Sequence, residues 1–172
     1  EPCMVYDPDI DMDRVTFDLD CRSRKLDMLN ALIEKHHPRD KLLVFTSSQR
    51  FANAVAHRVC AKTALYTGAQ SAKARSEAFA GFTAGGVQVL LCTVGAAAEG
   101  LDGLQRVCHV EVWLDEDLNG MLCEQAKGRL NRMGQPAERI IRYYFQARDT
   151  MDDGTFQRLA QQAENNRSVL NK

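Results

Sequence analysis

Five short apolar runs alternate with helix-like segments along the chain, and this alternation constrains the fold more than any other feature of the sequence. The runs are largely continuous in Val, Leu, Ile and Phe and are bounded by Gly, Ser or Asp: Lys41–Ser47, Thr63–Thr67, Val87–Thr93, Val107–Leu114 and Arg139–Gln146. Runs of this kind are typical of strands in a parallel sheet that helices cover on both faces. The sequence therefore predicts an α/β fold with a mainly parallel central sheet flanked by helices.

The segments between these runs carry apolar side chains at helical spacing. They predict helices over Ser23–His36, Arg50–Cys60 and Ser71–Phe82, and a final helix over Asp153–Leu170. The aspartate-rich residues 1–22 are typical of a linker or a lead-in strand. We therefore expect one domain over residues 23–149, followed by a C-terminal helix within residues 150–172 that braces it.

The charge of the chain limits how it can hold nucleic acid. Twenty-two basic residues stand against 23 acidic ones, so the formal net charge is −1. A domain that bound nucleic acid through bulk charge would be basic. Any contact with nucleic acid must therefore come from a local patch.

The cysteines and the hydropathy pattern indicate an intracellular protein. The six cysteines form no C-x-x-C pair and no cluster with histidine at metal-ligand spacing, so no metal site is expected: Cys3, Cys21, Cys60, Cys92, Cys108 and Cys123. We predict buried free thiols in a reducing compartment. No apolar run approaches the roughly 18 residues of a membrane helix, and no charged-then-apolar leader opens the sequence.

The most informative segment is Gln125-Ala-Lys-Gly-Arg129-Leu-Asn-Arg132-Met-Gly-Gln135. On a helix, Gln125, Arg129 and Arg132 fall at i, i+4 and i+7 and share one face, which continues a core-facing stripe of Leu118, Met121 and Leu122. That stripe supplies no carboxylate, although a buried guanidinium needs a partner of opposite charge. Two arginines alone would fit ion pairs with acidic residues elsewhere in the fold. The alternative partner is a phosphate group, which a planar guanidinium binds through two parallel hydrogen bonds.

The complete segment resembles motif VI of Snf-type superfamily-two helicases, Q-A-x-x-R-x-x-R-x-G-Q. Further family motifs occur in the expected order across residues 23–170. Matching segments are Ser23-Arg-Lys-Leu26 at the domain opening, Leu43–Ser47 for motif IV, Tyr66-Thr-Gly68 with Arg75 for motif IVa, Thr93–Asp102 for motif V, the Asp115–Asn119 turn, and Thr150-Met-Asp152 at the close. The resemblance implies the second RecA-like motor domain of an ATP-dependent translocase or helicase.

The resemblance also implies roles for single residues. Arg129 and Arg132 would be arginine fingers that reach the γ-phosphate of ATP, and Gln125, Gly100 and Asp102 would lie at the same nucleotide. A second set of residues would contact backbone phosphates of the nucleic-acid strand along which the motor moves, through hydroxyl and main-chain N–H groups. This set comprises Ser47, Gly68 and Thr93. By the same resemblance, the nucleic acid would be duplex DNA. Taken singly, Thr93 also fits a plain strand cap, and Gly68 and Gly100 fit plain turn glycines.

Some residues depart from the family pattern. Asp102 stands where Snf-type proteins usually have asparagine, and Gly120 follows Asn119 where they have proline. Residues 96–98 are all alanine, in place of a stretch that usually contains glycine. This last departure affects how motif V would contact the strand.

The sequence lacks the other half of an ATP site. No lysine follows a glycine, so there is no P-loop to hold the β- and γ-phosphates. The run Val110–Glu116 ends in Asp-Glu like a Walker B strand, but without a P-loop it has no magnesium-bound phosphate to hold. A complete enzyme would need a first RecA-like domain as partner, with ATP and Mg²⁺ as its cofactors, and we expect the isolated chain to be inactive.

Two other interpretations remain. One is a catalytically idle RecA-like module that binds nucleic acid or serves as a scaffold. The other is a nucleotide- or sugar-binding α/β domain of another family. The sequence argues against it, because no G-x-G-x-x-G follows the first predicted strand.

Overall fold

The computed structural model describes residues 23–147 and 150–170. Its centre is a five-stranded sheet in the order β2-β3-β1-β4-β5, and all the neighbouring strands are parallel. The strands are β1 (Leu42–Thr46), β2 (Thr63–Tyr66), β3 (Val89–Thr93), β4 (Val110–Trp113) and β5 (Ile141–Tyr144). This is the RecA-like α/β fold that the alternating runs and motifs predicted, with each strand shorter than its apolar run.

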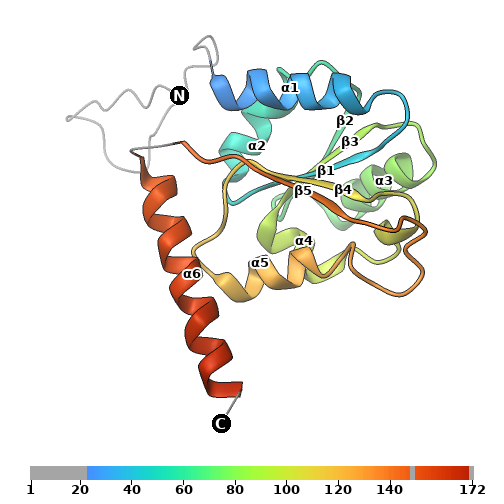
Figure 1. Ribbon diagram of the computed structural model, residues 1–172. Helices are drawn as coiled ribbons and strands as arrows, with labels where there is room; N and C mark the ends of the chain where they lie inside the picture. The colour runs from blue at the N-terminus through green and yellow to red at the C-terminus, as the bar shows by residue number, and fades with distance from the viewer. Residues whose placement is uncertain (1–22, 148–149, 171–172) are drawn as a thin grey trace.

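Helices cover both faces of the sheet (Figure 1). One face packs against α1 (Arg24–His36) and α2 (Gln49–Ala56). The other packs against α3 (Ala72–Thr83), α4 (Val94–Gly100) and α5 (Gly120–Lys127). A short 3₁₀ helix, Leu104–Arg106, precedes β4.

Alternate residues of the central strands point to the two helical layers. On β1, Leu43 and Phe45 face α3, α4 and α5, whereas Leu42 and Val44 face α1 and α2. All four side chains are fully buried. A central strand covered on both faces therefore favours apolar residues at nearly every position, which explains the continuous runs in the sequence.

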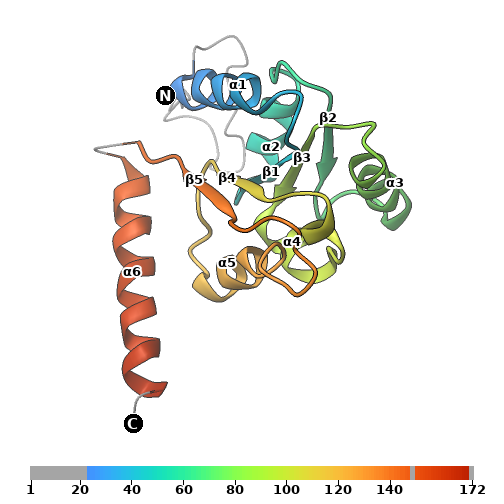
Figure 2. The same cartoon turned by 45° about the vertical axis from the view of Figure 1, so that its right-hand side comes forward.

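The C-terminal helix α6 (Met151–Leu170) extends away from the sheet (Figure 2). Its first turn is tied to α1 by an ion pair of 2.5 Å between Lys25 Nζ and Asp152 Oδ2, and the same ammonium group donates to the carbonyl of Leu114. Near its middle, α6 approaches the start of α5, where a Cβ atom on Gly120 would stand 2.8 Å from Gln162 Oε1. The predicted helix thus lies against the domain that it was expected to brace.

Two helical predictions need correction. The predicted helix Arg50–Cys60 ends at Ala56, and residues 94–100, for which no helix was predicted, form α4. The alanines Ala96, Ala97 and Ala98 of α4 are all buried. Their small side chains let this short helix pack closely against the sheet.

The predicted burial of the cysteines holds for Cys92, Cys108 and Cys123. Burial raises the pKa of the Cys108 thiol to about 12, which keeps it protonated and inert. Cys60 is exposed, so the prediction is wrong there. Cys3 and Cys21 lie outside the described residues, together with the whole predicted lead-in of residues 1–22.

Within the described part of the chain, no helix is long and apolar enough to cross a membrane.

Candidate functional site

The three residues predicted to contact a nucleic-acid backbone lie at one edge of the sheet. Thr46 at the end of β1 pairs in register with Thr93 at the end of β3. On the other side of β3, Tyr66 pairs with Cys92, so Gly68 follows at the same edge. Ser47, Thr93 and Gly68 lie at or just after the carboxyl ends of three adjacent strands. Because parallel strands end at the same edge of a sheet, the three residues lie where open α/β sheets bind their ligands.

The Thr93 side chain does not cap a helix. Thr93 occupies the N-cap position of α4, but its hydroxyl makes no capping hydrogen bond. At the neighbouring edge positions, Ser48 and Ser71 cap α2 and α3 in the usual way, each accepting a hydrogen bond from a backbone N–H. Thr93 is the last residue of β3, so its position fits the strand-cap alternative as well as a contact with a backbone phosphate.

Asp115 joins the ends of β1 and β4 at this edge. Its carboxylate accepts hydrogen bonds from Thr46 Oγ1 at 2.8 Å and from the backbone N–H of Ser47 at 2.5 Å. Four residues later, Asn119 caps α5 by accepting from the N–H groups of Met121 and Leu122. The D-x-x-x-N turn thus fixes the backbone at Ser47 and the start of α5.

The predicted helical face of Gln125, Arg129 and Arg132 is not formed. The helix α5 ends at Lys127, and both arginines lie in the turns that follow. The backbone N–H of Arg129 donates to Ala126, three residues back, which tightens the chain out of the α-helical pattern. The two arginines are therefore displayed by a turn rather than by a helix.

The stripe on α5 also differs from the prediction. Leu118 and Met121 are 54% and 71% exposed, so they do not face the core. Cys123, Ala126 and, beyond the helix, Leu130 fill the core positions instead. The core-facing side of α5 is therefore rotated relative to the predicted stripe, of which only Leu122 packs partly against the core.

Gln135 holds the arginine-bearing turns against the sheet. Its side-chain Nε2 donates to the carbonyl of Cys108 at 3.0 Å and to that of Leu130 at 3.3 Å. Gly134 has a φ of +88°, which side-chain-bearing residues rarely adopt, and this allows the chain to reverse between Arg132 and Gln135.

Both arginines turn toward the end of α4. A nitrogen of the Arg129 guanidinium, Nη2, donates to the carbonyl of Ala98, and Arg132 Nη1 forms an ion pair with Asp102. Arg132 Nε also donates to the carbonyl of Gly128 at 3.2 Å. The structure thus brings Arg129 and Arg132 to Ala98 and Asp102, in the segment that resembles motif V.

Gly100 lies close to the side chain of Tyr66. A Cβ atom there would lie 2.9 Å from the hydroxyl oxygen of Tyr66. The Tyr66 ring lies under the guanidinium of Arg75, whose central carbon is 5.9 Å from the ring centre. Gly100 is the last residue of α4, not a plain turn glycine, and Tyr66 connects the motif IVa segment to the arginine cluster.

The electrostatics of the cluster favour an anion. Burial and the positive charge of Arg132 lower the pKa of Arg129, which still remains charged at neutral pH. Arg129 Nε is buried and has no hydrogen-bond partner within the described part of the chain. A buried donor without a partner is costly, so this site would gain from an anionic acceptor.

Gln125 is not brought into this cluster. It is exposed on α5, and its side chain makes no hydrogen bond within residues 23–147 and 150–170. Nor does the Asp-Glu pair after β4 form a separate site, because Asp115 holds β1 and Glu116 pairs with Lys127.

Comparison with known proteins identifies the family. Residues 24–134 match the model of the helicase conserved C-terminal domain. The chain belongs to this family. It is therefore a helicase conserved C-terminal domain, as the order of its motifs predicted. No curated protein matches its sequence.

Two solved structures of other proteins share this fold. The C-terminal part of the Fun30 ATPase domain is similar with a TM-score of 0.70 and 17% identity over 80% of this chain. The Pyrococcus furiosus Hef helicase domain is similar with a TM-score of 0.62 and 21% identity over 78% of this chain. The chain spans 46% of the first structure and 28% of the second, so it corresponds to less than half of either.

Proposed function

We propose that this helicase C-terminal domain is the second motor domain of a Snf-type translocase that moves along duplex DNA. In this proposal, a first RecA-like domain supplies the P-loop, Mg²⁺ and most contacts to ATP. The domain described here adds Arg129 and Arg132 from across the cleft. The supporting observation is that two guanidiniums, one with a buried unpartnered Nε, lie together on a turn fixed against motif V.

The present partners of the two arginines are exchangeable. Asp102 is 83% exposed, so its ion pair with Arg132 contributes only about 0–1 kcal/mol. A triphosphate carries more negative charge than one carboxylate and accepts two parallel hydrogen bonds from each guanidinium. Arg129 has five N–H donors, of which the Ala98 carbonyl engages one.

In hydrolysis the arginines would stabilise charge rather than carry out covalent chemistry. Negative charge spreads over the oxygens of the transferring phosphoryl group in the transition state, and fixed guanidiniums lower its energy. Asp102 and Gly100 would lie beside the nucleotide, and Gln125 would reach it only if α5 borders the closed cleft. The Snf-type assignment itself rests on the segment from Gln125 to Gln135.

An idle scaffold module is the second candidate. The observation in its favour is that both guanidiniums already have protein partners, Ala98 and Asp102. The two candidates differ in what they predict for ATP hydrolysis by the two-domain protein.

We expect the isolated chain not to hydrolyse ATP, because it has no P-loop to hold the phosphates. The same domain joined to a first motor domain should hydrolyse ATP, with stimulation by duplex DNA. The measurement is phosphate release by both proteins, with and without DNA. Turnover by the isolated chain that disappears in an Arg132→Ala variant would overturn the proposed division of the site, and an inactive two-domain protein would favour the idle module.

The strand track has its own test. Thr93→Val should weaken binding of the two-domain protein to duplex DNA without changing the dependence of affinity on salt, because a hydroxyl releases no counterion. Arg50 lies in the first turn of α2, three residues after Ser47, and we expect its guanidinium to neutralise one backbone phosphate. Arg50→Ala should therefore make the slope of log affinity against log salt shallower by about 0.9. Fluorescence anisotropy at several salt concentrations measures both effects.

Thr63→Val is the matched control for Thr93→Val. Thr63 begins β2, and its hydroxyl donates to the carbonyl of Ala61 at the opposite edge of the sheet. It should leave DNA affinity unchanged. Equal affinities for the Thr93 variant and the wild type would remove Thr93 from the track.

A further inference from the structure

A fully buried carboxylate lies on β4, outside the arginine cluster. Glu111, on β4, has 0% exposure and pairs in register with Arg142 of β5. Its Oε1 atom accepts from Arg142 Nε and, at 3.3 Å, from the indole N–H of Trp113. Burying an unpaired carboxylate would be prohibitive, so the charge of Arg142 is what allows Glu111 to occupy this strand.

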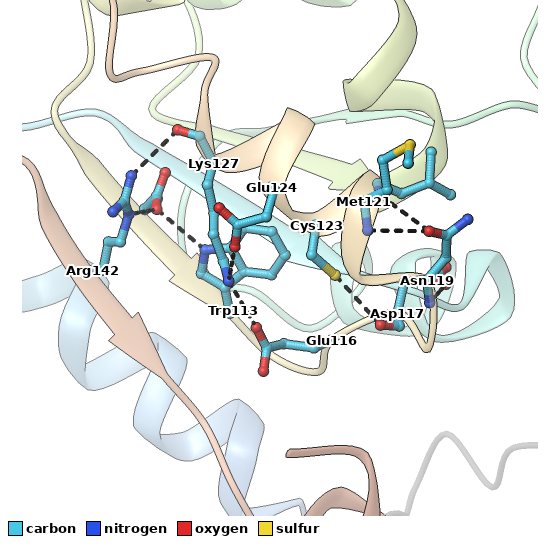
Figure 3. A network of polar contacts seen from close by, with 11 residues as sticks. Trp113, Glu116, Asp117, Asn119, Met121, Cys123, Glu124, Lys127 and Arg142 are labelled. Atoms are coloured by element: carbon cyan, nitrogen blue, oxygen red, sulfur yellow. Dashed lines mark hydrogen bonds and ion pairs between the residues drawn. The ribbon is translucent and has the colours of Figure 1, made fainter. Parts of the chain in front are cut away.

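The second arm of Arg142 reaches the end of α5 (Figure 3). Arg142 Nη2 donates to the carbonyl of Lys127 at 3.3 Å. Lys127 is the last residue of α5, and the final carbonyls of a helix have no partner within it. Arg142 therefore connects the sheet to the helix terminus two residues before Arg129.

The side chain of Lys127 holds the same terminus from the other side. Its ammonium group lies 5.4 Å from the Trp113 ring centre and 5.6 Å from that of Tyr144. It also pairs with Glu116 and Glu124, each at 3.2 Å. Both the backbone and the side chain of the last α5 residue are thus anchored to the sheet and its following loop.

We propose that Arg142 is a positioning residue for Arg129. By bridging the Glu111 carboxylate and the Lys127 carbonyl, it fixes where α5 ends and hence where the Arg129 guanidinium stands. This inference rests on the proposed role of Arg129 at the γ-phosphate. A lysine at position 142 keeps the charge beside Glu111 but has no planar fork to make the second contact.

The test is Arg142→Lys in the two-domain enzyme. We expect kcat for ATP hydrolysis to fall by about 10- to 100-fold, the loss that a displacement of about 1 Å produces, whereas KM for ATP stays within about twofold. A purely structural role would lower the amount of folded enzyme and leave kcat per folded molecule unchanged. Arg139→Lys, an exposed arginine on the same segment, is the matched control and should leave both constants unchanged.

A double-mutant cycle shows whether Arg142 acts through Arg129. Adding Arg142→Lys to Arg129→Lys should lower kcat much less than it does in the wild-type background, because the group that it positions is already replaced. Full additivity, or an unchanged kcat in the single variant, would overturn the inference. If Arg142→Lys does not fold, Glu111→Gln serves instead, since it keeps the shape of the anchor but removes its charge, and the same split between kcat and KM is expected.

Failure of this inference is distinguishable from failure of the proposed function. If Arg129→Ala leaves kcat unchanged, the proposed role of Arg129 is wrong. If Arg129→Ala abolishes hydrolysis while Arg142→Lys does not alter kcat, only the positioning role of Arg142 is wrong.

Discussion

Arg129→Ala and Arg132→Ala are each expected to lower the rate of ATP hydrolysis by the two-domain enzyme by a factor of about 10³–10⁵. Each variant removes a guanidinium that would stabilise charge on the transferring phosphoryl group. If the arginines only formed ion pairs within the domain, their loss would cost about 0–1 kcal/mol of stability and little activity. Steady-state phosphate release at saturating ATP and DNA measures the effect.

Lysine in place of Arg129 or Arg132 should restore little of this activity, because the point charge of an ammonium group does not reproduce the planar, two-pronged guanidinium. Arg106→Ala is the control, since Arg106 is an exposed arginine in the 3₁₀ helix that follows motif V. Circular dichroism should show that all variants keep the fold. Alanine variants that are folded and retain a tenth of the wild-type rate would contradict the assignment of both arginines.

Trp113→Ala is expected to lower the free energy of unfolding of the isolated chain by about 3–5 kcal/mol, the cost of removing a large buried aromatic side chain. Trp113 is 1% exposed, and its ring lies 4.4 Å from Phe45 and 6.1 Å from Tyr144, measured between ring centres. The change would also remove the ring beneath Lys127 and leave Glu111 without its indole donor. Urea denaturation of the chain measures the loss.

Met133→Ala provides the comparison for this prediction. Met133 is 97% exposed, so its truncation should change the free energy of unfolding by no more than about 0.5 kcal/mol. A loss below about 1 kcal/mol for Trp113→Ala would mean that the layer between β4 and α5 contributes little to stability.

The central sheet was predictable from the sequence because its strands are buried on both faces. At a position such as Val44, both neighbouring strands and the covering helices exclude water, so only an apolar residue is tolerated. The strand starts were less predictable, since the predicted runs begin at Val107 and Arg139, whereas the first paired residues are Val110 and Ile141. The motif order identified the family but did not determine these boundaries.

The geometry of the arginine cluster was not predictable from periodicity. The spacing of Gln125, Arg129 and Arg132 fits a helical face, but the chain leaves the helix at Gly128 because Gln135 holds the Leu130 carbonyl and Leu130 enters the core. These contacts depend on tertiary packing, which the helical spacing of the sequence does not indicate. Gly128 was the one local signal, since glycine weakens a helix interior.

The anchor formed by Glu111, Arg142 and Lys127 was missed for a related reason. A glutamate within the apolar run Val110–Trp113 indicates a buried charge that needs a cation. Which cation it meets depends on the register between β4 and β5, and this register is set by packing. The sequence therefore carried the signal for the carboxylate but not for its partner.

The central claim is that Arg129 contacts the γ-phosphate in the transition state, and the affinity for a transition-state analogue tests it most directly. ADP with aluminium fluoride should bind the wild-type two-domain enzyme at least about 10²-fold more tightly than it binds the Arg129→Ala variant, because such analogues report contacts made in the transition state. The affinity for ADP alone should be the same in both. Equal affinity for the analogue, or an equal loss for ADP and the analogue, would contradict the account.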